Sequence, residues 1–323
     1  MSLTTQIVVK NNAKTIRKCL DSIAALNGKI LILDIGSNDN SINICQDFGA
    51  NIKRQSLNSD YSKLRNENIP KSDWFLWIQP WEELICGHDE INLISSQIDY
   101  EKCFDIKTIN KTIISRETRF WHTGLDIKFK NRIFESPIVS DCPLAQNVVI
   151  NQHVGQQDFD ELKSICSQWK KEHPLIDEPI YYDAYLMLLN GKYKEFCHMA
   201  EHYLFKDKKD MADILMRYNL AQVQIYQQKQ FNAGVGNALS CLMYNPAIAE
   251  FWCLLGDAFY QLKEMNKAII FYENAIIAGE TRELDSFPID VSKYKEYPTK
   301  MIKSCEELIS QTKYYFKMQD QVH

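Results

Sequence analysis

The chain has 323 residues, which is enough for two domains of ordinary size, each with its own buried core. Its formal net charge of −5 argues against a protein that holds nucleic acid by bulk electrostatics, and only a local basic groove would keep that function open as a minority alternative. The ten cysteines are scattered singly, without a Cys-x-x-Cys pair or a Cys/His cluster at zinc spacing, so we expect most of them to be reduced and buried.

The first part of the chain predicts alternating strands and helices. Apolar runs at 6–9, 30–33 and 74–78 are typical of buried parallel strands, and 51–53 is a weaker, edge-type strand. Helical patterns separate them over 16–23, 41–48 and 61–68. The predicted order is β-α-β-α-β-α-β, an α/β fold in which ligands bind at the carboxyl ends of the strands.

Residues 104–150 predict further strands. Apolar and polar residues alternate here, as in 129–134 and 147–150, which is typical of half-buried strands that complete a sheet.

After Asp158 the strand signals disappear and aromatic residues recur at helical spacing. The offsets match the tetratricopeptide pattern of about 34 residues, and the clearest unit carries Trp252, Leu255, Gly256, Phe259, Ala268, Tyr272 and Ala275. An earlier unit at 218–246 fits if one residue slips in the turn, a degenerate unit is expected over 182–205, and 305–318 is expected to be a capping helix. We expect these aromatics to pack against one another. The predicted domains are 1–157 (α/β) and 158–323 (all-α, tetratricopeptide-like).

Four polar blocks follow the predicted strands of the first domain, within residues 7–16, 30–41, 60–68 and 73–84. The third block reads Asp60-Tyr61-Ser62-Lys63-Leu64-Arg65-Asn66, against Asp-Phe-Ser-x-x-Arg-Asn in the family it resembles. The succession of blocks resembles the family 2 glycosyltransferases of GT-A fold, over roughly residues 4–155. The resemblance implies a Rossmann-like domain that binds a nucleotide sugar, most often a UDP-sugar.

The resemblance assigns the base and ribose contacts to Val9, Asn11, Asp34 and Ser37. A carboxylate such as Asp34 can accept from a uracil imide or a ribose hydroxyl, although Asp and Ser after a strand often only cap the next helix. Arg65 would hold the base or a phosphate with its guanidinium, and the alternative is a surface arginine paired with an acidic neighbour.

The fourth block departs from the family pattern. Relatives carry Asp-x-Asp-Glu, which holds a divalent metal, where this chain has Gln79-Pro80-Trp81-Glu82. The resemblance places Gln79 and Trp81 at the nucleotide sugar, but a hard cation such as Mn²⁺ or Mg²⁺ prefers anionic oxygens, which these two residues do not supply. Glu82 and His153 are weak metal candidates, and Glu82 with Glu83 could instead be solvated residues at a helix start. The enzyme is therefore metal-independent, takes a metal elsewhere, or has lost catalysis.

The family run that ends in His-Glu falls at residues 128–135, where the glutamate survives as Glu135. Glu135 is the candidate general base, with an ordinary ion pair to Arg132 or Lys130 as the alternative.

The leading hypothesis is an inverting glycosyltransferase that moves a sugar from a UDP-sugar to a protein, peptide or glycan acceptor. The alternative from another class is an inactive scaffold that binds a protein through its helical repeats, and a weaker one is a transferase acting on modified bases in DNA. The repeats could also form a homodimer interface. No signal peptide is evident and no apolar run approaches the ~20 residues of a membrane span, which predicts a cytoplasmic protein.

Overall fold

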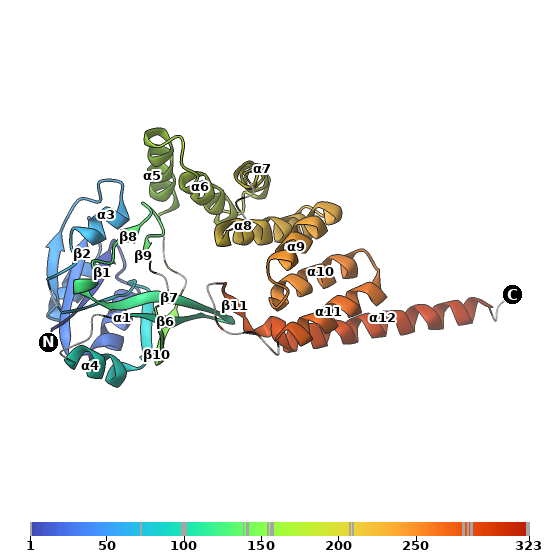
Figure 1. The fold of residues 1–323 in the computed structure, drawn as a ribbon, viewed down its shortest axis with the longest axis horizontal. Coiled ribbons are helices and arrows are strands. Elements are labelled where there is room, and N and C mark those ends of the chain that lie inside the picture. Colours follow the sequence, from blue (N-terminus) through green and yellow to red (C-terminus); the bar gives the residue numbers. More distant parts are fainter. Residues whose placement is uncertain are drawn as a thin grey trace. The chain divides into compact units, whose positions relative to one another are not determined.

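The computed structural model describes residues 2–71, 73–97, 102–137, 139, 142–153, 155, 158–206, 208, 210–279, 282, 284 and 287–320, with side chains up to residue 312. The chain divides into two compact units, residues 1–176 and 177–323. The first is α/β and the second is almost entirely helical, which confirms the predicted fold class (Figure 1). The division falls after residue 176, so the helix that follows Asp158 belongs to the first unit.

The first unit alternates strands and helices up to β4 in the predicted order. Its elements are β1 (Leu3–Val9), α1 (Ile16–Ile23), β2 (Gly28–Asp34), α2 (Ser41–Asp47), β3 (Asn51–Arg54), α3 (Tyr61–Asn66), β4 (Trp74–Trp77), β5 (Glu82–Cys86), α4 (His88–Ser96), β6 (Cys103–Asn110), β7 (Ile113–His122), β8 (Phe129–Lys130), β9 (Ser136–Pro137), β10 (Leu144–Gln152) and α5 (Phe159–Glu172).

The main sheet has a parallel half and a mixed half. Its strand order is β3-β2-β1-β4-β7-β6-β10-β5, and β3, β2, β1 and β4 run parallel. β7 is antiparallel to both β4 and β6, while β10 is parallel to β6 and antiparallel to β5. The carboxyl ends of β1, β2 and β4 therefore meet at one edge, which brings together polar blocks that are far apart in the sequence.

One sequence expectation needs correction in this unit, and one disulfide was not foreseen. The run 129–134 is a strand only over β8, because Asn131 and Phe134 adopt positive φ angles of 69° and 50° and turn the chain. Cys103 and Cys142 are joined by a disulfide, because the parallel pairing of β6 with β10 places the start of one beside the residues leading into the other. Of the eight free cysteines, all but Cys86 are buried, as expected.

A buried ion pair lies beneath the turn between β4 and β5. Arg119 donates from Nη1 and Nη2 to the two carboxylate oxygens of Glu82, both at 2.9 Å, and also bonds Glu117. The guanidinium lies 3.7 Å from the ring centroid of Trp77. Burial lowers the pKa of Arg119, but Glu117 and Glu82 outweigh this and raise it. Glu82 is thus a buried strand residue and not a solvated helix start.

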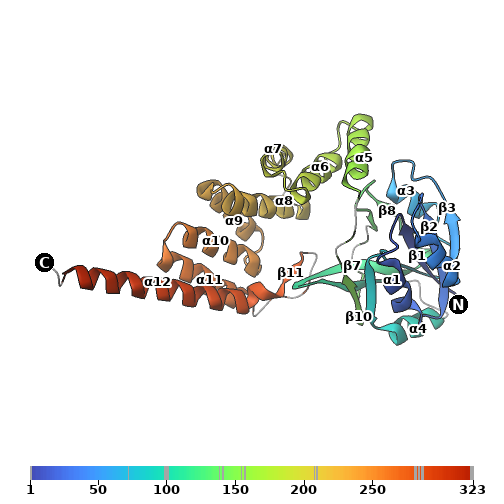
Figure 2. The same ribbon diagram turned by 180° about the vertical axis from the view of Figure 1, so that it is seen from behind.

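The second unit is built of successive helices that pack against their neighbours in the chain (Figure 2). They are α6 (Glu178–Leu189), α7 (Tyr193–Leu204), α8 (Met211–Gln222), α9 (Phe231–Tyr244), α10 (Ala249–Gln261), α11 (Met265–Gly279) and α12 (Glu296–Asp320). A π-helical segment, Val223–Gln227, follows α8 where the sequence pattern allowed a one-residue slip. None of the described helices has the length and apolar character needed to cross a membrane.

The clearest predicted repeat unit coincides with the pair α10 and α11. Gly256 of α10 lies against Tyr272 of α11, so closely that a Cβ on the glycine would come within 2.5 Å of the ring. The Tyr272 hydroxyl donates to the buried carboxylate of Asp257 at 2.7 Å, and the Tyr297 hydroxyl donates to the same oxygen at 2.6 Å. The aromatics of this segment are therefore core residues, as expected.

We predict that Gly256→Ala lowers the free energy of unfolding by about 1–3 kcal/mol, because the added methyl group overpacks the contact with Tyr272. Gly236→Ala on α9 is the matched control, because no atom lies within 4 Å of its added Cβ, and alanine should favour that helix by roughly 0.5–1 kcal/mol. Urea unfolding followed by circular dichroism measures both, and equal effects of the two changes would contradict the packing argument.

We also predict that Arg119→Met costs about 3 kcal/mol or more of stability, because it leaves the Glu82 carboxylate buried without its cation. The double variant Arg119→Met/Glu82→Gln should be distinctly more stable than the single one, because a neutral amide is less costly to bury. Chemical unfolding monitored by tryptophan fluorescence tests this, and a double variant no better than Arg119→Met would disprove the role of the pair.

Candidate functional site

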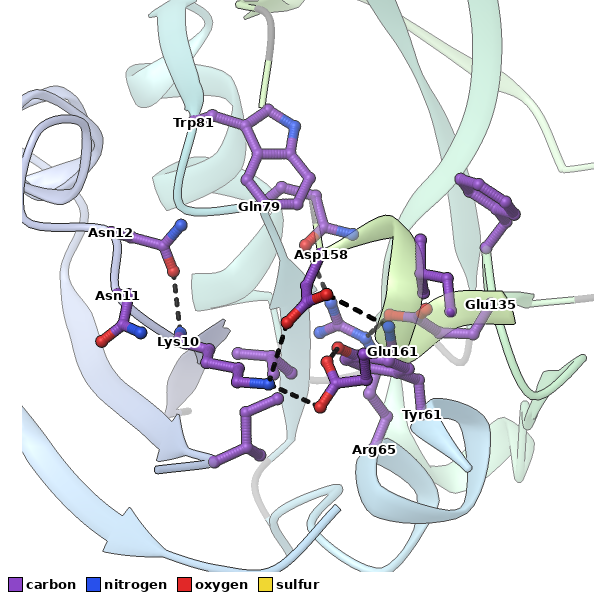
Figure 3. A pocket seen from close by; sticks show the side chains of 14 residues that line it. Lys10, Asn11, Asn12, Tyr61, Arg65, Gln79, Trp81, Glu135, Asp158 and Glu161 are labelled. Atoms are coloured by element: carbon purple, nitrogen blue, oxygen red, sulfur yellow. Dashed lines mark hydrogen bonds and ion pairs between the residues drawn. The ribbon is translucent and has the colours of Figure 1, made fainter. Parts of the chain in front are cut away.

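A pocket of about 280 Å³ opens at the carboxyl ends of the parallel strands (Figure 3). It lies entirely within the first unit. Its lining comes from the ends of β1, β2 and β4, from α3, from the segment before β9 and from the start of α5: Val8, Lys10, Asn11, Asn12, Ile35, Tyr61, Arg65, Gln79, Trp81, Phe134, Glu135, Asp158, Glu161 and Leu162. Of the residues singled out from the sequence, this places Asn11, Arg65, Gln79, Trp81 and Glu135 around one cavity.

Strand alternation decides which residues of β1 reach the pocket. Successive side chains of a strand point to opposite faces. Val9 packs into the hydrophobic core, and its neighbours Val8 and Lys10 line the pocket instead. The Val9 side chain is therefore not part of the pocket lining, and a contact of this residue with the nucleotide stays a prediction.

The turns after β1 and β2 hold each other in place. Asn11 has a φ of 56°, in the left-handed region that asparagine tolerates, and its backbone N–H donates to Ser37 Oγ at 3.2 Å. In return, Asn38 N donates to Asn11 Oδ1 at 2.8 Å. Asp34 is buried and accepts from Ser37 N at 2.8 Å. Asp34 and Ser37 thus shape the turn without lining the pocket, while Asn11 does both.

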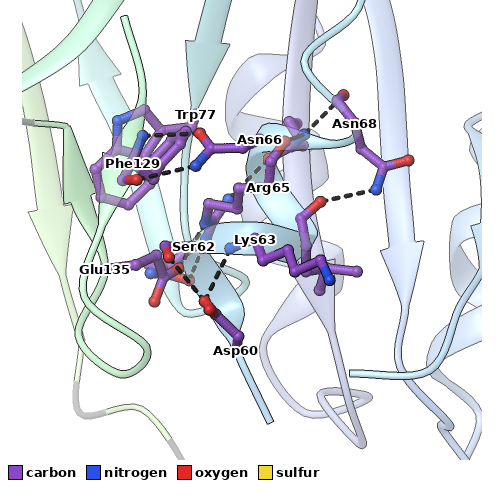
Figure 4. Close-up of polar contacts among 12 residues, drawn as sticks. Asp60, Ser62, Lys63, Arg65, Asn66, Asn68, Trp77, Phe129 and Glu135 are labelled. Atoms are coloured by element: carbon purple, nitrogen blue, oxygen red, sulfur yellow. Dashed lines mark hydrogen bonds and ion pairs between the residues drawn. The ribbon is translucent and has the colours of Figure 1, made fainter. Parts of the chain in front are cut away.

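Arg65 is a buried cation that lines the pocket. Its Nε donates to Glu135 Oε1 at 2.5 Å (Figure 4). Its Nη1 and Nη2 donate to the side-chain oxygens of Gln6 and Gln79, each at 3.2 Å. The guanidinium also lies 5.0 Å from the ring centroid of Trp77, within cation–π range. The sequence alternative, a surface arginine, is wrong.

The helix that carries Arg65 starts at a capped end. Asp60 accepts from Lys63 N at 2.9 Å, as an N-cap residue does. Glu135 reaches Arg65 from the segment after β8, where Tyr61 N donates to the carbonyl of Arg132 at 3.0 Å. Glu135 therefore pairs with Arg65 and not with Arg132, whose guanidinium bonds Glu172 at 2.6 Å.

The first turn of α5 closes the pocket from another side. Asp158 caps this helix by accepting from Glu161 N at 3.1 Å. Glu161 Oε1 lies 2.5 Å from Lys10 Nζ, and its other oxygen accepts from the Tyr61 hydroxyl at 3.2 Å. Burial raises the pKa of Tyr61, and the carboxylates of Glu161 and Glu135 raise it further, so the hydroxyl remains a donor.

The carboxyl end of β4 does not fit a divalent cation. The Gln79 side-chain oxygen is bonded to Arg65, and Trp81 is an apolar ring packed against Gly155. Both oxygens of Glu82 are bonded to Arg119, and Gln79 N and Gln152 donate to them as well. These side chains leave no anionic oxygen free for a metal at this position.

His153 lies outside the pocket lining and pairs with Glu83, with 2.8 Å between His153 Nε2 and Glu83 Oε1. In the part of the chain that the structure describes, no group of three or more His, Cys, Asp or Glu side chains is placed to hold a metal ion.

Sequence reasoning missed five charged or polar lining residues: Lys10, Asn12, Tyr61, Asp158 and Glu161. Lys10 could have been found from the alternation of β1, because it shares a face with Val8. Asp158 and Glu161 could not, because nothing in the sequence places the start of a distant helix over the end of β1.

Residues 5–78 match the family model "Glycosyl transferase family 2". The chain is similar to the SPbeta prophage-derived glycosyltransferase SunS of Bacillus subtilis, with 24% identity over 221 residues, 64% of this chain and 51% of SunS. It is also similar to a TPR repeat-containing protein of Synechococcus elongatus, with 26% identity over 147 residues, 43% of this chain and 36% of that protein. A crystal structure of S. aureus TarS, residues 1–349, superposes with a TM-score of 0.35 at 13% identity, covering 95% of this chain and 92% of TarS.

The chain spans about half the length of SunS. The matched residues 5–78 include β1, β2, α3 and β4, the elements that carry Asn11, Arg65 and Gln79 to the pocket. Residues 5–78 of the N-terminal unit thus carry the match to the family 2 glycosyltransferases, and helices of the tetratricopeptide-like pattern follow in the second unit.

Proposed function

We propose that this protein is an inverting glycosyltransferase that moves a sugar from a UDP-sugar to a macromolecular acceptor. The observation that carries the proposal is the Arg65–Glu135 pair in a pocket at the carboxyl edge of the parallel strands of a family 2 glycosyltransferase domain. Strand ends of this kind are where open α/β sheets bind their ligands.

The nucleotide would lie against the turns after β1 and β2. Asn11 offers a side-chain amide on the pocket side of these turns, and Asp34 and Ser37 keep the turns in shape. Ile35 and Val8 supply apolar surface for a flat base. Arg65 would fix the position of Glu135 and of the Gln79 amide.

The proposed reaction is a direct displacement at the anomeric carbon. Glu135 takes the proton of the acceptor hydroxyl or thiol, and the acceptor atom forms a bond to the anomeric carbon as the bond to the β-phosphate oxygen breaks. UDP leaves with the bonding electrons, and the configuration at the anomeric carbon inverts. Glu135 lines the pocket and only its Oε1 atom is bonded to Arg65, which leaves Oε2 to accept the proton.

The proposal extends to the acceptor, the metal requirement and the location. The helix pairs of the second unit favour a protein, peptide or glycan acceptor, and the same helices could join two copies of the chain. Because the end of β4 lacks free anionic oxygens, we propose that the donor binds without a metal there.

The proposed location is the cytoplasm. The buried free thiols agree with that location, whereas disulfide bonds such as Cys103–Cys142 are rare in that compartment.

One observation favours a second candidate, a domain that binds without catalysing transfer. Every carboxylate in the pocket lining is engaged by a cation, Glu135 by Arg65, and Asp158 and Glu161 by Lys10. A general base held in this way has reduced freedom to take a proton, and such a protein would act as a scaffold for a partner of its helical unit.

We expect UDP to stabilise the protein by about 2.7 kcal/mol at a concentration one hundred times its dissociation constant, without added Mn²⁺. Asn11→Gly keeps the left-handed backbone but removes the amide, together with its bond from Asn38 N, and it should weaken UDP binding about fivefold or more, as for at least one lost hydrogen bond. Asn40→Gly, on the exposed cap of α2, is the control and should not change binding. Calorimetric titration with and without Mn²⁺ measures these affinities, and absence of UDP binding in both conditions would refute the proposal.

We expect Glu135→Gln to slow the release of UDP from its sugar donor by about a hundredfold or more, as for loss of a general base. The amide can still accept from Arg65, so UDP affinity should remain close to that of the native protein. The control is Glu67→Gln, an exposed residue at the end of α3. Chromatographic assay of UDP release from a panel of UDP-sugars tests this prediction. A Glu135→Gln variant that releases UDP at the rate of the native protein would show that Glu135 is not the general base. A native protein that is inactive with every donor and acceptor would favour the scaffold.

A further inference from the structure

The contact between β1 and α5 is not explained by the proposed chemistry. Lys10 Nζ lies 2.5 Å from Glu161 Oε1 and 3.8 Å from Asp158 Oδ2. The Tyr61 hydroxyl donates to Glu161 Oε2, so an ammonium group and a hydroxyl from two different elements bind one carboxylate inside the pocket (Figure 3). Where the related motif has phenylalanine, this chain has a tyrosine, whose hydroxyl makes that bond.

This arrangement would suit an anionic ligand as well as it suits Glu161. Lys10 brings a full positive charge from the end of β1, and its backbone N–H is fixed by Asn12 Oδ1 at 2.8 Å. Tyr61 stands at the start of α3, one turn before Arg65. Together they present two donors that converge on the same point in the pocket, and a phosphate oxygen accepts from the same donors as a carboxylate oxygen.

The charge of the pocket depends on Glu161. With its side chain in place, the lining holds two cations, Lys10 and Arg65, and three carboxylates, Glu135, Asp158 and Glu161, a net charge of −1. When the Glu161 carboxylate leaves, the two cations balance the two remaining carboxylates. A nucleoside diphosphate is repelled by the net charge of the first state and not by that of the second. A metal would resolve this conflict, but the end of β4 has no free anionic oxygen to hold one.

We propose that Lys10 and Tyr61 form the subsite for the diphosphate of the donor, and that the Glu161 carboxylate occupies this subsite until the nucleotide displaces it. This inference rests on the proposed function and deepens it. Lys10 supplies the positive charge that a metal ion would bring to the diphosphate, and its contact with Glu161 occupies the subsite when no nucleotide is bound.

The contacts of α5 make such a displacement feasible. Ile165 and Trp169 are buried, and Glu172 bonds Arg132 at 2.6 Å, so the body of the helix is anchored. The Lys10 and Glu161 side chains are 29% and 26% exposed, and ion pairs open to solvent contribute little stability. A diphosphate, with more charge and more acceptor oxygens, can therefore replace Glu161 by moving that side chain alone.

The test compares Glu161→Gln, Lys10→Met and the control Glu172→Gln, which removes the same charge from the same helix outside the pocket. Calorimetric titrations at low ionic strength use UDP, uridine and inorganic pyrophosphate as probes. We expect Glu161→Gln to bind UDP and pyrophosphate roughly tenfold more tightly than the native protein and Lys10→Met roughly tenfold more weakly, because one charge next to the diphosphate changes in each. Uridine affinity should not change in any variant, and Glu172→Gln should match the native protein for every probe.

The outcomes separate this inference from the proposed function. If UDP binds all four proteins equally, the subsite is elsewhere and the inference fails while the transferase proposal stands. If pyrophosphate follows the expected order but neither uridine nor any UDP-sugar binds, the anion subsite stands and the transferase proposal fails. If no probe binds any protein, both fail. Thermal unfolding of each variant checks its fold, and the near-isosteric Glu161→Gln keeps the test decisive if Lys10→Met proves unstable.

Discussion

The buried guanidinium of Arg65 fixes the geometry of the whole pocket. A charged group that is buried away from water needs hydrogen-bond or ion-pair partners from the protein. The partners of Arg65 are Gln6 on β1, Gln79 after β4 and Glu135 before β9. Each partner belongs to a different part of the chain, so the three segments can satisfy the cation only in one arrangement. The same requirement explains why a glutamine stands where a metal ligand would: its amide oxygen faces a cation of the protein itself.

A second buried guanidinium, that of Arg119, contacts the same tryptophan ring as Arg65, the ring of Trp77. Arg119 lies 3.7 Å and Arg65 lies 5.0 Å from the ring centroid of this tryptophan, and Arg119 takes both oxygens of Glu82. The turn between β4 and β5 is therefore held by charges of the protein itself. Where the resembled motif has Asp-x-Asp-Glu, the side chains of Gln79 and Glu82 are bonded to Arg65 and Arg119.

The fold could be predicted further than the site. The strands up to β4 can be predicted from their apolar runs, because a fully buried strand is apolar whichever strands lie beside it. The helix pair α10 and α11 can be predicted from the spacing of Trp252, Gly256 and Tyr272, which is likewise a local pattern. Motif residues Arg65 and Glu135 could be found, but their pairing could not, since it depends on a turn with positive φ at Phe134. The place of Glu161 depends on how a helix far along the chain packs, which local sequence does not encode.

The carboxylates of the two units have different kinds of partner, and the exchangeable contacts lie in the first unit. Asp257 of the second unit accepts from the hydroxyls of Tyr226, Tyr272 and Tyr297, neutral donors that tie α10 to its neighbours. Burial raises the pKa of all three tyrosines, so these hydroxyls stay protonated donors. Glu161 of the pocket instead faces Lys10, a partly exposed cation that a more highly charged ligand can bind. A network of neutral donors fixes a structure, whereas exchangeable ion pairs at the edge of a sheet leave room for a substrate to compete.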